Sequence, residues 1–496
     1  MKTSRFEVLS QEEVERIHAA SMEILAEVGI KVNYKKAREL FREAGAEVDE
    51  STLAVKIPEK LIRWAVDQAP KQFSLYGIDA QFRLDLGPVQ AAPIFAGLGT
   101  PTRMLDLKSG EPRACTKQDM IDHIILIDAC NHIHNSQMDI WPDDIPMTTI
   151  HTEAIWAWAH HSRKPYGMGC YGYLPTWDMM RMMSIAVGGK AELQKRPRFF
   201  AICSVVSPLQ MDQAQAEGLL VCAEYGQPVT CAPEAIAGIS APVTLAGLLA
   251  QENAAILAHI TLAQIFRPGA PVLYGTVSTT ANMRFGTVTL GSPETGLISA
   301  ASAQMARYYG LPIRSVGGAT DSKREDTQAG FERMGTLLPP VLAGVNLITC
   351  AGTLDSTMLE SHALLMLDDE ICGAAVRMAR GIDVNDETLS LELIKKVGYS
   401  SNYITAKETS KLYRKELFIP TLFSREPYET WEKEGRKLAI DRARERALDV
   451  LAKHQPREVD PTIERDLDAF RQMVATRNLE DFYLSETEEK QDFANL

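Results

Sequence analysis

The chain has 496 residues, 45% of them hydrophobic and 24% charged, which is typical of a soluble globular protein with a large buried core. Its formal net charge of −13 argues against nucleic acid or an anionic membrane surface as a partner. The sequence contains no uncharged apolar run of about 18 residues and no signal-peptide pattern. Its eight cysteines are too sparse for a disulfide framework. We therefore expect a cytoplasmic protein with reduced thiols.

Residues 1–90 are predicted to form a mostly helical N-terminal subdomain. Ser10 and Glu13 have the spacing of a helix capping box, and the helix that they begin is expected to end near Gly29. Two further helices are expected over residues 34–44 and 58–68, followed by a short strand over residues 73–77.

Residues 91–385 contain short apolar runs separated by helix-like segments, such as residues 211–225 and 244–266. The eight runs cover residues 93–98, 134–139, 165–171, 199–205, 228–232, 271–276, 311–316 and 346–350. Their starts lie about 30 to 45 residues apart, the length of one βα unit. Eight such units predict an α/β fold, a (β/α)8 TIM barrel with helical N-terminal and C-terminal extensions. An open doubly wound sheet remains the alternative, because periodicity does not separate the two.

Residues 386–496 are predicted to form a helical C-terminal extension. Helices are expected over residues 389–397 and 405–417, and one long charged helix over residues 428–453, with Pro456 and Pro461 as breaks. The last 25 residues are acidic and form either a packing arm or a partly disordered tail.

Three residues with functional side chains follow predicted strands, at the end where barrel enzymes hold their chemistry. Glu234 follows the run at 228–232 and Asp321 follows the run at 311–316, although either could equally cap a βα loop. His362 follows the loop at Gly352 and is a candidate ligand contact, with a histidine on an ordinary helix face as the alternative.

No catalytic triad, zincin motif or paired-cysteine site stands out, so no catalytic side chain and no metal ligand is predicted. His132 and His134 have the spacing of metal ligands, but they lie at the entrance of a strand, the end of a barrel away from chemistry. Residues 167–172 match the letters of a dinucleotide fingerprint without its strand and helix context.

Aromatic residues gather at the predicted strand ends. Phe95, Tyr171, Tyr173 and Tyr274 lie at or just past a strand end, and Trp141 follows a strand. A ring of aromatic faces is how proteins hold a quaternary ammonium group. Ordinary packing at the mouth of the barrel is the alternative.

Several segments together resemble the trimethylamine methyltransferase family in its non-pyrrolysine branch, which includes glycine betaine:corrinoid methyltransferases. They cover residues 97–101, 105–113, 238–247, 317–323 and 338–346, and the resemblance extends over nearly the whole chain. The family is known as a barrel. Its trimethylamine members carry pyrrolysine in the loop after the strand that holds Cys350, at a position matched within a residue or two by Ser356. An ordinary residue there makes trimethylamine itself a doubtful substrate.

The resemblance implies a methyltransferase that moves a methyl group from a quaternary amine to the cobalt(I) of a corrinoid protein. Glycine betaine, giving dimethylglycine, is the expected substrate, and proline betaine, carnitine, γ-butyrobetaine or a non-catalytic betaine-binding barrel are the alternatives. The cobalamin would belong to the partner protein, with no cofactor bound tightly by this chain. Phe95, Tyr171, Tyr173, Glu234, Tyr274, Asp321, Ser356 and His362 are the expected substrate-binding residues, and the helical extensions would supply the interface of a homo-oligomer.

Overall fold

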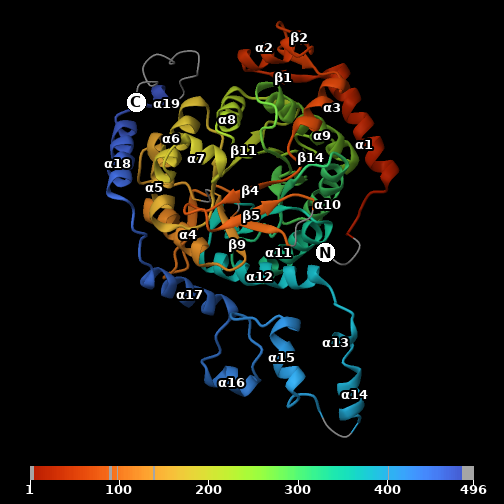
Figure 1. Cartoon of the computed structure of the whole chain (residues 1–496), viewed down its shortest axis with the longest axis vertical. Coiled ribbons are helices and arrows are strands. Elements are labelled where there is room, and N and C mark those ends of the chain that lie inside the picture. The colour runs from red at the N-terminus through yellow and green to blue at the C-terminus, as the bar shows by residue number, and fades with distance from the viewer. Residues whose placement is uncertain (1–4, 89–91, 98, 138–139, 400–401, 483–496) are drawn as a thin grey trace.

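The computed structural model describes residues 5–88, 92–97, 99–137, 140–399 and 402–482, and its centre is a closed barrel of eight parallel strands (Figure 1). The eight predicted apolar runs all form barrel strands. In order around the barrel these are β6 (Ile94–Gly97), β9 (Ile133–Gln137), β10 (Tyr166–Gly169), β11 (Phe199–Val205), β13 (Val229–Pro233), β15 (Val272–Gly275), β18 (Ile313–Val316) and β19 (Leu347–Ala351). The prediction of a (β/α)8 barrel is confirmed, and the open sheet is excluded by the pairing of β6 with β19.

Helices cover the outside of the barrel, one or more after each strand. The principal ones are α4 (Lys117–Ala129), α5 (Ile150–His161), α6 (Tyr173–Val187), α8 (Gln213–Glu224), α9 (Leu245–Phe266), α10 (Pro293–Tyr308), α11 (Thr327–Ala343) and α12 (His362–Arg380). By length and composition α9 could cross a membrane, but 78% of its most apolar window is buried inside the protein. It is a core helix of the barrel wall.

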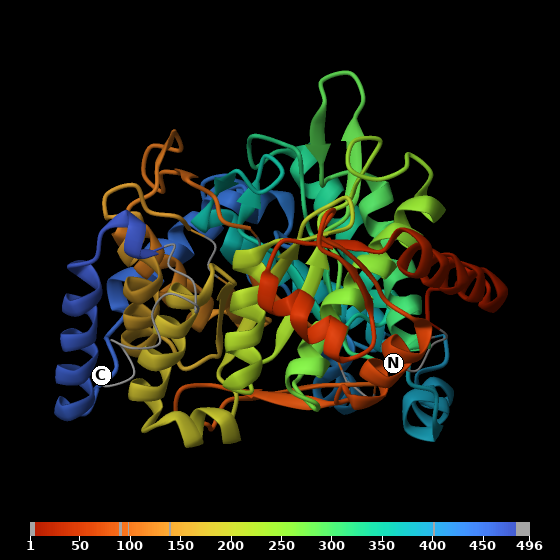
Figure 2. The same cartoon turned by 90° about the horizontal axis from the view of Figure 1, so that it is seen from above.

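A hairpin closes the N-terminal end of the barrel. Its strands β4 (Phe73–Tyr76) and β5 (Arg83–Leu86) contribute Leu75 and Leu86 to an apolar cluster. The cluster also contains one or more side chains from each of four barrel strands: Ile94, Ala96, Phe200, Leu273 and Leu347. Because these strands lie around the barrel, side chains that meet in one cluster point into its interior. Figure 2 shows this hairpin in orange along the lower edge of the molecule.

The N-terminal segment contains the expected helices and also three strands that the sequence analysis missed. Helix α1 (Gln11–Glu23) begins with the predicted Ser10–Glu13 capping box and continues as a π-helix to Val28 before Gly29. Helices α2 (Lys35–Glu43) and α3 (Glu59–Gln68) also occur as predicted. Strands β1 (Ile30–Val32), β2 (Glu47–Asp49) and β3 (Ala54–Lys56) have three residues each, too few to show an alternating pattern. Strand β1 pairs with β12 (Gln210–Met211), which joins this segment to the barrel.

The C-terminal segment corrects one helix boundary. The single helix predicted over residues 428–453 is two helices, α16 (Tyr428–Lys433) and α17 (Ala439–Lys453). Gly435 and Arg436 both adopt positive φ angles, 93° and 56°, which end the first helix. Before them come α13 (Asp386–Leu389), α14 (Leu391–Val397) and α15 (Lys407–Glu416), and after them α18 (Pro461–Ala475) and α19 (Leu479–Phe482). The prediction about the acidic tail falls mainly on residues 483–496, which lie outside the described residues.

Candidate active site at the mouth of the barrel

The interior of the barrel contains polar side chains beside the apolar cluster. Asn135 lies beside Ala96 in the strand register, Thr230 beside Leu273, and Arg314 beside Leu347. Residues side by side in neighbouring strands point to the same face of a sheet, so these three polar side chains point into the barrel with the apolar cluster. All three are at least 98% buried.

Two of these interior groups have unsatisfied hydrogen-bonding capacity. Among the described residues, neither Nδ2 nor Oδ1 of Asn135 has a hydrogen-bond partner, and neither has Oγ1 of Thr230. Buried polar groups are normally paired, so such atoms indicate a place for water or a ligand. The guanidinium of Arg314 adds a positive charge to the same interior, and one of its nitrogens donates to the carbonyl of Thr276 at 3.4 Å.

Glu234 follows β13 directly and occupies the mouth above these groups. Its side chain is exposed, yet surrounding protein desolvates it and raises the pKa of its carboxyl, while the charge of Arg314 acts in the opposite direction. A residue that is both accessible and desolvated lies in a recess rather than on a convex surface. Glu234 is therefore placed where the sequence analysis expected it, at the C-terminal end of a barrel strand.

The loops after β18 and β19 bring Asp321 and Ser356 together. The hydroxyl of Ser356 donates to Oδ1 of Asp321, which also accepts the backbone N–H of Gly291 at 3.1 Å. The backbone N–H of Ser356 donates to the carbonyl of Thr320 at 2.9 Å. Two residues far apart in sequence thus belong to one hydrogen-bonded group at the rim, as expected for neighbouring βα loops.

The loop that carries Ser356 has an unusual backbone. Asp355, Ser356 and Thr357 all adopt positive φ angles, of 51°, 50° and 76°. Side chains other than glycine rarely adopt this conformation, and each instance costs about 1–3 kcal/mol. The loop is held by contacts to the β18 loop, including the ion pair between Lys323 and Asp355 at 2.9 Å. Strain of this kind is concentrated at functional sites.

Two aromatic side chains lie together on the part of the rim across from the loops after β18 and β19. The ring of Tyr171 covers Gly169, where a Cβ atom would lie 2.9 Å from the ring. Trp141 meets Tyr171 edge to face, with 5.9 Å between ring centroids. Trp141 also lines a pocket of about 470 Å³ between the loops after β6 and β9. Of the five aromatic residues expected at the mouth, these two lie together.

The structure corrects the predicted orientation of Phe95 and Tyr274. Each lies next to a residue that points into the barrel, so each points outward toward the helices. Phe95 is fully buried and stacks on His134, and the hydroxyl of Tyr274 donates to Asn253 of α9 at 3.0 Å. The prediction that both face the ligand is wrong, because an unbroken apolar strand does not reveal which residues point inward.

The two remaining predicted residues lie elsewhere. Tyr173 begins α6 and is half-buried, with its backbone N–H donating to Glu217 at 3.2 Å. His362 begins α12 and is 1% exposed, so it lies beneath the surface of the mouth in contact with His123 and Glu360. Its predicted contact with a ligand at the opening is not what the structure shows.

The polar barrel interior was not predicted from the sequence. Arg314 is a charged residue inside an apolar strand run, and that contrast was a usable signal. Asn135 and Thr230 gave no such signal, since asparagine and threonine are common near strand ends.

A closed barrel of eight parallel strands, with a polar interior and a rim built from the loops at the C-terminal strand ends, is the architecture of an enzyme with its active site in the barrel mouth. The model of one family, trimethylamine methyltransferase (MTTB), matches residues 1–480. The chain belongs to this family and is a methyltransferase.

Relatives match over almost their whole length. The chain is 34% identical over 468 residues to a glycine betaine methyltransferase from Desulfitobacterium hafniense (strain Y51), covering 94% of this chain and 96% of the relative. It is 35% identical over 471 residues to a trimethylamine methyltransferase from Methanosarcina thermophila, covering 93% and 96%. Among solved structures, the Methanosarcina barkeri monomethylamine methyltransferase matches with a TM-score of 0.49 and 14% identity, covering 90% of this chain and 96% of the other.

Proposed function

We propose that the chain transfers a methyl group from glycine betaine to the cobalt(I) of a corrinoid protein, giving dimethylglycine. The family assignment supports methyl transfer, and a relative that shares 34% of the sequence is named for glycine betaine. The observation that carries the choice of substrate is the guanidinium of Arg314 inside the barrel.

Arg314 and Asn135 supply what a betaine carboxylate needs. A guanidinium donates charge-assisted hydrogen bonds to a carboxylate, and the unpartnered Nδ2 of Asn135 offers a further donor. Trimethylamine carries no carboxylate to accept charge-assisted hydrogen bonds from this guanidinium. The barrel interior therefore favours a zwitterionic substrate over a simple methylamine.

The trimethylammonium end would then lie nearer the opening. The rings of Tyr171 and Trp141 form an aromatic surface there, and aromatic faces attract quaternary ammonium groups. Glu234 adds a carboxyl at the same level, directly after β13. With the carboxylate held below, one N-methyl group is directed outward toward the methyl acceptor.

Methyl transfer requires little further chemistry from side chains. The cobalt(I) lone pair forms a bond to the methyl carbon while the carbon–nitrogen bond breaks and its electron pair stays on nitrogen. The products are methyl-cobalt(III) and a neutral tertiary amine, which needs no proton in order to leave. The protein's contribution is to orient the substrate and to exclude water.

The rim has the exposed apolar surface that a protein partner would cover. Ile239, Val243, Met283, Phe285 and Met358 are each 55% or more exposed, and all belong to loops or hairpins at the C-terminal end of the barrel. The hairpin with Met283 and Phe285, β16 (Thr279–Asn282) and β17 (Thr287–Thr289), rises above the barrel in Figure 2. Exposed apolar patches with polar surroundings mark protein interfaces. We propose that the corrinoid protein docks here and brings the cobalamin, with none bound tightly by this chain.

The direct test is methylation of cobalt(I) cobalamin, followed by its absorbance change, with a panel of methyl donors. The panel comprises glycine betaine, proline betaine, carnitine, γ-butyrobetaine, trimethylamine and buffer alone. Activity with glycine betaine supports the proposal, and activity with another betaine moves the assignment to that substrate. If the whole panel is silent with a corrinoid protein present, while glycine betaine still binds, the chain is a binding barrel instead.

Replacing Arg314 by methionine tests the carboxylate site. We expect Arg314→Met to weaken glycine betaine binding by roughly 10- to 100-fold, because a charged hydrogen bond contributes about 1.5–3 kcal/mol. Binding of tetramethylammonium, which has no carboxylate, should change much less. Tyr274→Phe is the matched control, since it alters only a hydrogen bond to α9 outside the barrel. Equal losses for both ligands would show that Arg314 serves folding rather than recognition.

A further inference from the structure

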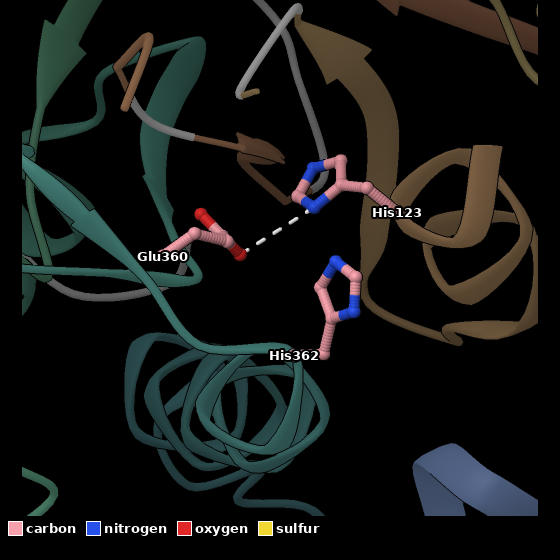
Figure 3. Close-up of side chains that lie close together, drawn as sticks. All are labelled: His123, Glu360 and His362. Carbon is pink, nitrogen blue, oxygen red and sulfur yellow. Dashed lines mark ion pairs between the residues drawn. The ribbon is translucent and has the colours of Figure 1, made fainter. Parts of the chain in front are cut away.

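Three side chains from separate elements converge beneath the rim, outside the proposed substrate site. His123 lies on α4, Glu360 on β21 (Leu359–Glu360), and His362 is the first residue of α12. One ligand atom from each lies within 4.8 Å of the others, and Nδ1 of His123 is 3.4 Å from Oε1 of Glu360. Figure 3 shows the carboxylate and both rings pointing toward a common centre.

Two members of this group, Glu360 and His362, are buried with polar atoms that lack a hydrogen-bond partner. The three side chains are at most 2% exposed, and neither oxygen of Glu360 nor Nε2 of His362 has a hydrogen-bond partner among the described residues. Several buried acceptor atoms that face one another repel, and burial leaves no bulk water to solvate them. An ion pair between His123 and Glu360 would satisfy one carboxylate oxygen. It would leave the second oxygen of Glu360 and Nε2 of His362 without a hydrogen-bond partner.

The protonation states also suit a bound cation. Burial, with a smaller effect from His123, lowers the pKa of His362 to about 3, so its ring is neutral and carries a lone pair. Burial raises the pKa of Glu360 and outweighs the opposing effects of His123 and Arg333. A bound metal ion would add a positive charge beside the carboxyl and would lower the pKa of Glu360 again.

We propose that His123, Glu360 and His362 bind a divalent transition-metal ion, zinc by the nature of its ligands. Two imidazoles and one carboxylate form a ligand set that zinc uses in proteins, and the second oxygen of Glu360 can complete the coordination. The site is closed to solvent, so the ion is structural. It fastens α4, β21 and the start of α12 to one another.

A metal ion at this site would also hold the strained loop at the rim in place. Strand β21 is the return strand of a hairpin with β20 (Thr353–Leu354), and residues 355–358, which include the three with positive φ angles, connect the two. A metal ion at Glu360 would fix the base of this hairpin and thereby the position of Ser356. This proposal does not depend on the substrate proposed above. No metal ligand was predicted from the sequence, because His123 on α4 lies far along the chain from Glu360 and His362.

The experiment measures metal content and stability rather than activity. The full chain, purified without chelators and then incubated with Zn²⁺ and desalted, should hold about one zinc per chain by mass spectrometry of the elements. Glu360→Gln and His362→Gln should each reduce this value at least fivefold. His151→Asn is the matched control, a buried histidine paired with Asp178 at 3.0 Å on other helices, and should keep the full metal content.

A second measurement keeps the test decisive if a variant fails to fold. The wild-type protein loaded with Co²⁺ should show the visible absorption bands of a low-symmetry nitrogen and oxygen site, and zinc should abolish them by displacement. Removal of the ion by a chelator should lower the melting temperature, and added Zn²⁺ should restore it. Wild-type protein that holds less than 0.1 zinc per chain after incubation, with an unchanged melting temperature, would overturn the proposal.

Discussion

Glu252 is a completely buried carboxyl in the middle of α9, and its titration makes stability depend on pH. It accepts hydrogen bonds from the hydroxyls of Thr276 at 2.8 Å and Ser302 at 2.7 Å. Burial outweighs these bonds and raises its pKa from 4.5 to about 7. Because the folded state holds this proton more tightly than the unfolded state, the stabilisation is complete below pH 4.5. It is lost as pH rises from 4.5 to 7, by about 3 kcal/mol.

Replacing Glu252 by glutamine should remove this dependence. The amide is neutral at every pH, so Glu252→Gln should gain stability relative to the wild type by about 3 kcal/mol between pH 5 and pH 8. Thermal unfolding of both proteins at the two pH values measures the change. Glu12→Gln, at an exposed position on α1, is the control and should show no such difference. A constant gap between Glu252→Gln and the wild type would contradict the pKa assigned to Glu252.

The connection between β19 and α12 is organised by one buried ion pair. Nε of Arg333 on α11 donates to Asp368 on α12 at 2.6 Å. The same guanidinium donates to the carbonyls of Cys350 and Thr353, and Asp368 also accepts the backbone N–H of Gly352 at 2.8 Å. The two side chains thus hold the chain on either side of Gly352, directly before the hairpin that presents Ser356.

Removing one partner of this ion pair should lower the stability of the fold. Arg333→Met leaves Asp368 and two carbonyls buried without their donor, and we expect it to lower stability by about 3–5 kcal/mol. Lys395→Ala, which removes an exposed ion pair with Glu392, should cost less than about 1 kcal/mol. Denaturant unfolding compares the variants. If Arg333→Met loses no more stability than Lys395→Ala, the buried pair contributes no more to folding than an exposed ion pair.

The elements of this fold differ in how well the sequence predicts them. Buried parallel strands are unbroken apolar runs between turn residues, so all eight barrel strands could be found. The same lack of alternation hid which face each residue occupies, and Phe95 and Tyr274 were placed on the wrong side. Asp321 and Glu234 could be predicted at the mouth because loops at one end of a barrel meet there, whereas Ser356 was predicted from the family resemblance. The group of His123, Glu360 and His362 is created by tertiary packing and has no local signature.

At the scale of the whole molecule, four short helices of the described C-terminal segment are not packed into the core. Helices α13, α14, α15 and α16 contain no buried residue, and Figure 1 shows them extending below the barrel as an arm. Apolar side chains of this arm are strongly exposed, at Ile382, Leu391, Ile394, Ile404 and Leu417. Helices of this length are marginal in water without a packing surface. We expect a second copy of the chain to provide that surface, as the sequence analysis predicted for the helical extensions.

Light scattering coupled to size-exclusion chromatography tests this expectation. The wild type should have a mass of at least twice the 54.9 kDa of one chain. The double change Leu391→Ser and Ile404→Ser should shift the mass toward a single chain, because it removes apolar area from the interface without touching the barrel core. Val28→Ser, at an apolar position in the N-terminal segment whose exposure of 62% lies between those of Leu391 and Ile404, should leave the mass unchanged. A wild-type protein with the mass of one chain would mean that the arm is stable in solution by itself. In that case the exposed apolar residues of the arm would have to serve a different partner, and the corrinoid protein would be the first to test.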